Sequence, residues 1–110
     1  MKRTLGSLAL AAVIGISGTG IAFADMDSYV TGGHAWRSGT SGGTVNIKDT
    51  SGNSESVFVQ YRRTGDTADR RLNNKSGYGA TVSSSGTKVV GLKACRDRNL
   101  MPDECDSWRK

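Results

Sequence analysis

Apolar and polar residues alternate in short runs along this chain, a pattern that predicts β-strands instead of helices. In residues 44–50, Val45 and Ile47 fall on one face, while the polar residues between them fall on the other. Residues 56–63 are apolar on both faces, so we expect a central strand that is covered on both sides. Its two sets are Val57, Val59 and Tyr61 on one face, and Phe58, Gln60 and Arg62 on the other.

Further strands are expected at residues 34–38, which carry Trp36, and at residues 71–74, where Leu72 points inward. The turn Ser84-Ser85-Gly86 is expected to close a hairpin, with its glycine in the left-handed conformation. In that register the facing residues are Tyr78, Ala80 and Val82 on one strand, and Leu92, Val90 and Lys88 on the other. Six or seven strands with no helical period predict an all-β fold, a small antiparallel β-sandwich or partly closed barrel.

The first 24 residues have the features of an export signal. Lys2 and Arg3 form a positive start, residues 8–14 form an apolar stretch, and residues 22–24 read Ala-Phe-Ala, the small-residue pattern that signal peptidase cleaves. The apolar stretch is shorter than the roughly 20 residues that span a bilayer. We therefore expect a signal peptide at residues 1–24, and a single secreted, extracellular domain at residues 25–110 with no membrane segment.

Removal of the signal peptide would leave 86 residues, enough for one hydrophobic core. Two of the 15 basic residues lie in the signal peptide and all 10 acidic residues follow it, so the domain has 13 basic residues and a net charge of +3. This balance suits a protein that must stay soluble near anionic cell-wall polymers, and charge alone selects no partner. It lacks the dense basic stripe of a nucleic-acid-binding protein.

The two cysteines, Cys95 and Cys105, predict a disulfide, because an even number of cysteines in a short exported chain usually pairs. Closing so short a loop stabilises a fold by about 3 kcal/mol in the chain-entropy model. A structural zinc site would need carboxylates to complete it, because His34 is the only histidine. We expect one C-terminal disulfide, no metal and no other cofactor.

One set of residues has the types needed for catalysis. Glu55, His34 and the pair Arg62-Arg63 would suffice for a small secreted ribonuclease. Their order differs from the familiar microbial family, whose glutamate comes first and whose histidine stands near the C-terminus. No Gly-x-Ser-x-Gly motif stands between a strand and a helix, as a hydrolase would require. We therefore expect no catalytic residues and no enzymatic activity, and a ribonuclease ranks third among the functions considered.

Oxygen-bearing side chains alternate at Asp49, Ser51, Asn53 and Glu55, as they do in calcium-binding loops. Glycine stands at the fourth position of this run instead of the sixth, and the bidentate twelfth ligand is missing. The sequence from Asn73 to Ser76 begins like the βγ-crystallin calcium motif but does not complete it. Plain turns are the favoured interpretation, and weak calcium binding at the Asp49-Glu55 turn stays open.

Two arginine pairs, Arg62-Arg63 and Arg70-Arg71, flank a polar connection and would converge if their strands formed a hairpin. Such a cluster could bind a phosphate or an acidic wall polymer. Asp66 and Asp69 lie in the same connection, so we expect a salt-bridged, solvated edge that discourages strand-to-strand aggregation.

The segment between the cysteines forms a candidate contact loop, with an apolar tip between charged flanks. Its candidate contact residues are Arg96, Arg98, Leu100, Met101 and Pro102 in the loop, and Trp108 after it. The alternative, favoured for so small a core, is that Leu100 and Trp108 fold back to plug one end of the sandwich.

Three short stretches carry a resemblance: the run Leu72-Asn73-Asn74-Lys75-Ser76-Gly77-Tyr78-Gly79, then residues 90–95, then the ending Pro102-Asp103-x-Cys105-x-x-Trp108. They resemble a group of small secreted actinobacterial proteins of unestablished function, which share an export signal, an LxNxxGxG turn and this ending. The resemblance implies a disulfide-bonded β-domain from a Gram-positive exporter. It implies no activity and no site residue.

These observations favour a non-enzymatic secreted β-sandwich module that acts by contact at the cell envelope or on another extracellular macromolecule. The expected partner is an unknown extracellular macromolecule or cell-wall polymer, and nucleic acid is not expected. The alternative is a secreted inhibitor or toxin-like effector that uses the Cys95-Cys105 loop.

Overall fold

The structure is a computed structural model that describes residues 26–110, so the expected signal peptide and the expected first secreted residue, Asp25, lie outside the described residues. The described part contains eight β-strands and no α-helix. They are β1 (Asp27–Val30), β2 (Gly33–Ser38), β3 (Thr44–Asp49), β4 (Ser56–Arg63), β5 (Arg70–Asn74), β6 (Thr81–Ser85), β7 (Val89–Asp97) and β8 (Glu104–Cys105). Within residues 26–110 there is therefore no helix long and apolar enough to cross a membrane.

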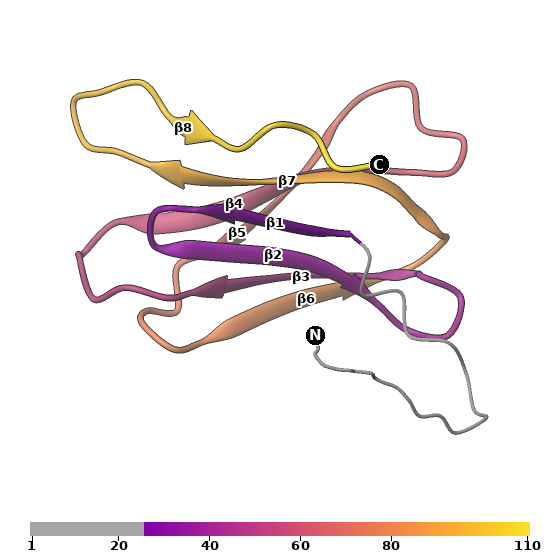
Figure 1. Ribbon diagram of the computed structural model, residues 1–110, viewed down its shortest axis with the longest axis horizontal. Helices are drawn as coiled ribbons and strands as arrows, with labels where there is room; N and C mark the ends of the chain where they lie inside the picture. Colours follow the sequence, from indigo (N-terminus) through magenta and orange to yellow (C-terminus); the bar gives the residue numbers. More distant parts are fainter. Residues whose placement is uncertain (1–25) are drawn as a thin grey trace.

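Two antiparallel four-stranded sheets pack against each other (Figure 1). The first sheet has the order β1-β2-β3-β6 and the second the order β5-β4-β7-β8. This confirms the all-β expectation and decides between its two forms, because the sheets make a sandwich and not a closed barrel. The core lies between them, and its fully buried members are Ala35, Val45, Ile47, Val59, Val89, Leu92 and Ala94.

The two clearest alternations in the sequence are confirmed. Val45 and Ile47 of β3 are fully buried on the inner face of the first sheet. β4 lies between β5 and β7, which confirms the expected central strand. Its outward Phe58 is only 1% exposed, because the Arg71 guanidinium lies 3.5 Å from the ring centroid and Cys95 lies directly across on β7.

The predicted hairpin between residues 78–82 and 88–92 is wrong. β6 pairs with β3, whereas β7 pairs with β4 in the other sheet, so residues 86–88 cross between the sheets. The crossing is held by main-chain hydrogen bonds from Gly86 and Val89 to the loop between β2 and β3. Alternation shows which side of a strand is buried but not which strand it pairs with, and Val82 is directed inward in either arrangement.

β1 was not expected from the sequence, because its inward position at Ser28 is polar. Ser28 is fully buried, and its hydroxyl accepts a hydrogen bond from the Ala94 amide at 2.8 Å and donates one to Asp106 Oδ2 at 2.8 Å. Burial raises the pKa of the Asp106 carboxyl, but hydrogen bonds from Ser28, Arg109 and two backbone amides outweigh that effect and lower the pKa to about 2. Asp106 thereby joins the edge of the first sheet to the C-terminal segment.

The LxNxxGxG turn has a structural role. The Asn74 side chain is fully buried, and its amide donates to the carbonyl oxygens of Ile47 at 2.9 Å and Ala80 at 2.8 Å. The first of these bonds crosses from the second sheet to the first. Gly77 and Gly79 have φ angles of 103° and 86°, a conformation that strongly favours glycine.

Candidate functional site

One end of the sandwich collects the loops 50–55, 75–80 and 98–103, on the left in Figure 1, and is called the loop end. These loops surround an open cleft of about 520 Å³. Its lining is mostly polar and consists of Asp49, Ser51, Gly52, Ser54, Glu55, Ser56, Asn74, Lys75, Gly77, Tyr78, Asp97 and Asn99. Asp97 and Asn99 belong to this lining, so the cysteine loop stands at the rim of the cleft.

The predicted disulfide is confirmed. Cys95 and Cys105 face each other across β7 and β8, with a Cα–Cα distance of 4.0 Å. Arg96 forms ion pairs with Glu104 of β8 and, at 3.2 Å, with Glu55. Arg98 Nε donates to the Pro102 carbonyl at 3.1 Å. Both arginines thus make contacts within the chain, and these contacts hold the loop in place.

The loop tip points into solvent. Leu100 has a relative exposure of 105% and Met101 of 56%, so the expectation that Leu100 plugs the sandwich is wrong. Leu100 has a φ angle of 59°, in the left-handed region that bulky residues rarely occupy. It follows Asn99 in a turn closed by the weak Met101 N to Arg98 O hydrogen bond of 3.5 Å, at the position where glycine or asparagine is preferred.

Trp108 lies apart from the loop tip. Its half-buried indole covers Gly91 on the outer face of β7, where a β-carbon would lie 3.6 Å from the ring. Lys93 Nζ and Arg62 Cζ lie 4.9 Å and 5.7 Å from the centroid of the ring. Trp108 therefore covers a sheet face instead of closing an end, so its half of the plug hypothesis is wrong as well.

The residues considered for a ribonuclease are not brought together. His34 lies on the outer face of the first sheet, where its Nε2 is 2.8 Å from Asp27 Oδ1 and its ring stacks between Tyr29 at 4.2 Å and Trp36 at 4.6 Å. Burial, together with the nearby Asp27, raises the pKa of Tyr29. Glu55 instead pairs with Arg96 of the second sheet.

The Asp49-Glu55 turn uses its oxygen atoms to hold its own backbone. Asp49 Oδ1 accepts a hydrogen bond from the Ser51 amide at 3.1 Å, and Asn53 Oδ1 accepts one from the Glu55 amide at 3.1 Å. Within residues 26–110, no three acidic, histidine or cysteine side chains gather in a way that could hold a metal ion.

The two arginine pairs do flank a hairpin, since β4 pairs with β5. Arg62 pairs with Asp69, and Arg70 Nε lies 2.7 Å from Asp66 Oδ2, which confirms the salt-bridged edge. Hydrogen bonds from Arg70 and from a backbone amide lower the pKa of Asp66 to about 2. Arg63 differs from its neighbours, because it is only 5% exposed and lies in the interior.

Two features were missed at the level of sequence. Tyr29 joins the stack on His34 only because β1 pairs with β2, and β1 has no apolar alternation to reveal it. The cations around Trp108 come from three separated segments, and only the sheet register assembles them.

Comparison with known proteins found no matching family model, no matching curated protein and no matching solved structure.

Proposed function

We propose that this protein is a secreted, non-enzymatic β-sandwich that acts by binding another extracellular protein through the contact tip, defined as Leu100 and Met101. The observation that carries the proposal is the state of Leu100, which is fully exposed and held at a φ angle of 59°. A bulky residue in this conformation costs free energy and gains no packing in return. Binding to another protein would account for both the exposure and the strained backbone of Leu100.

The energetics of the tip suit a protein partner. Burying a leucine or methionine side chain on association is worth about 1.5–3 kcal/mol. The loop is already braced by the disulfide and by the internal contacts of Arg96 and Arg98, so binding would order few new groups. A protein surface with an apolar pocket would complement such a tip. The polar cleft beside the tip would then form part of the rim of the interface.

An extracellular setting is part of the proposal. The export signal expected at residues 1–24 and the formed disulfide are both typical of proteins that work in an oxidising compartment. The resemblance of the C-terminal half to small actinobacterial secreted proteins supports a Gram-positive exporter as the source.

An inhibitor is the special case of this function in which the partner is an enzyme. It is favoured by the form of the site, because a braced convex loop beside an open cleft can enter a concave active site. A panel of purified extracellular proteases and wall hydrolases would separate the two forms, since an inhibitor lowers turnover and an adhesive module leaves it unchanged.

Photo-crosslinking tests the proposal directly. A photoreactive amino acid is placed at position 100 and, as the matched control, at position 29, where Tyr29 is also a large side chain and is 62% exposed. Each protein is irradiated with the supernatant and envelope fraction of the producing cells, and adducts are identified by mass spectrometry. We expect a protein adduct from position 100 that excess wild type abolishes and excess Leu100→Ser does not. Equal labelling from position 29, or adducts with lipid alone, would refute the proposal.

A further inference from the structure

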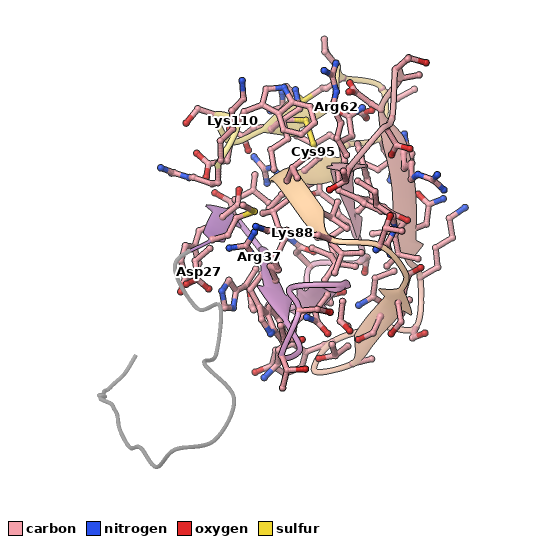
Figure 2. The ribbon with its side chains drawn as sticks, turned by 90° about the vertical axis from the view of Figure 1, so that its right-hand side faces the viewer. Asp27, Arg37, Arg62, Lys88, Cys95 and Lys110 are labelled. Carbon is pink, nitrogen blue, oxygen red and sulfur yellow. A yellow bond between two sulfur atoms is a disulfide. The ribbon has the colours of Figure 1, made fainter. Side chains whose placement is uncertain are left out.

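A second hollow of about 330 Å³ lies on the outer face of the second sheet, away from the contact tip. We call it the Trp108 groove, and it is lined by Arg62, Val90, Gly91, Trp108 and Lys110. Figure 2 shows Arg62 and Lys110 on the same side of the molecule, above Cys95.

The groove follows from how the C-terminal segment runs along β7. Leu92 and Arg109 exchange two main-chain hydrogen bonds, at 3.0 Å and 2.8 Å. The residues on either side of Arg109 therefore point to the face that carries Gly91, and Lys110 lies 3.8 Å from the position of a Gly91 β-carbon. The Trp108 ring lies 3.6 Å from the position of the same β-carbon, so the indole lies close over Gly91.

Three cations surround this aromatic floor. Arg62 is opposite Gly91 on β4, Lys93 is two residues further along β7, and Lys110 follows Trp108 by two residues. Arg62 shares its charge with Asp69, at a side-chain exposure of 51% and 36% respectively. Lys93 and Lys110 form no ion pair with any residue in the described range 26–110. The groove therefore combines an apolar ring with positive charge that is left largely uncompensated.

We infer that the Trp108 groove binds an anionic glycan, a saccharide chain whose rings bear carboxylates or phosphates. The apolar face of a sugar ring packs on Trp108 and Val90, while its anionic group lies among Arg62, Lys93 and Lys110. A neutral glycan would offer no counter-charge to Lys93 and Lys110, which have no ion pair within residues 26–110. A nucleic acid would need a longer basic track than three cations at one groove.

This inference is independent of the proposed function, because the groove and the contact tip use different residues and different surfaces. Together they would let the protein rest on an anionic envelope polymer while the tip engages another protein. Failure of either experiment leaves the other unaffected.

The chain contains its own reporter for this site. Its two tryptophans lie on opposite sheets, Trp36 on the outer face of β2 and Trp108 on the outer face of β7. In Trp36→Phe, the intrinsic fluorescence therefore reports on Trp108 alone. In Trp108→Phe it reports on Trp36 alone and serves as the control.

The probes are oligogalacturonate for the carboxylate source, a phosphomannan fragment for the phosphate source, neutral dextran, and single-stranded poly(U). We expect a saturable change in Trp108 fluorescence with at least one of the two anionic saccharides, weakened by raised salt. The stronger of the two identifies the anion. No change with either, an equal change with dextran, or equal affinity for poly(U) would overturn the inference.

Charge substitutions complete the test. Lys93→Gln and Lys110→Gln should each weaken binding by about fivefold, as expected for single exposed charges, and the double variant by about tenfold or more. Lys48→Gln, which removes the same charge from the outer face of the first sheet, should leave binding unchanged. If Lys48→Gln weakens binding as much as Lys93→Gln, the attraction follows net charge and the groove is not the site.

Discussion

The two ends of the sandwich use their side chains in opposite ways. At the end formed by loops 39–43, 64–69 and 86–88, called the arginine end, the Arg63 guanidinium is buried and donates hydrogen bonds to the carbonyl groups of Gly43, Ser84 and Thr87. Arg37 is also buried there, and its Nη1 donates to the Val89 carbonyl at 2.8 Å (Figure 2). At the loop end, large apolar side chains instead stand in solvent.

The contrast separates residues that serve folding from residues that do not. Arg63 ties the ends of three strands together. A β-carbon at Gly86 would lie 2.9 Å from Arg63 Cζ, so a larger residue there would displace the guanidinium. A buried charge of this kind is tolerated only when its hydrogen bonds are made. Leu100 has no comparable packing in residues 26–110, and this contrast is the basis on which we propose a partner outside the domain.

The largest effect is expected at the arginine end. Arg63→Met should lower the free energy of unfolding by about 3–5 kcal/mol, because it removes three hydrogen bonds that a buried guanidinium donates to backbone carbonyl groups. The adjacent Arg62→Met removes an exposed ion pair and a 5.7 Å contact with the Trp108 ring, and should cost less than about 1 kcal/mol. Urea denaturation of both variants measures the difference. Similar losses would show that Arg63 does not hold this end together.

The disulfide should have the next largest effect, and it bears on the loop end. Replacing Cys95 and Cys105 with serine should cost about 2–4 kcal/mol of stability through loop-closure entropy. The variant should also bind its partner less tightly than its stability alone would explain, because the tip loses its bracing. Crosslinking from position 100 at a temperature where the variant is still folded checks this. Unchanged crosslinking would mean that bracing contributes nothing to binding.

Asp106 lies between the two ends and should give a smaller, pH-dependent effect. Its folded pKa of about 2 is below its usual value of 3.8, so its contribution is complete above that usual value and is lost as the pH falls toward 2. Allowing for solvent screening, the contribution is about 1–2 kcal/mol. Asp106→Asn should be less stable than wild type at pH 7, with the gap closing between pH 4 and pH 2 in thermal or urea melts. A gap that stays constant across this range would contradict the assigned role.

Much of the fold follows from the sequence wherever an inward face is apolar. The alternations in β3 and β4 and the proximity of the cysteines were sufficient to predict those elements. The inward set Val57, Val59, Tyr61 also continues to Arg63, so the same period already placed that arginine in the interior. Its charge led to the opposite expectation, because a single strand does not reveal the carbonyl groups that satisfy it.

The remainder depended on pairing between distant segments. β1 is recognised as a strand only by the partners of Ser28, which come from the C-terminal half. β6 and β7 each have an alternation that fits a hairpin equally well, and only the competition among all strands assigns them to different sheets. The exposed tip was recognised as a candidate from its composition, but its exposure and its positive φ angle are properties of the folded loop.

The substitution expected to change stability least, at Leu100, is the most direct test of whether the loop end serves binding instead of folding. Leu100→Gly removes the side chain and relieves the backbone cost of a φ angle of 59°, so the free energy of unfolding should stay unchanged or rise by up to about 1 kcal/mol. The measurement is urea denaturation of Leu100→Gly beside wild type, with the variant then used as a competitor in the crosslinking experiment. We expect undiminished stability together with failure to compete. A stability loss of more than about 1 kcal/mol, or competition equal to that of wild type, would show that Leu100 is a structural residue.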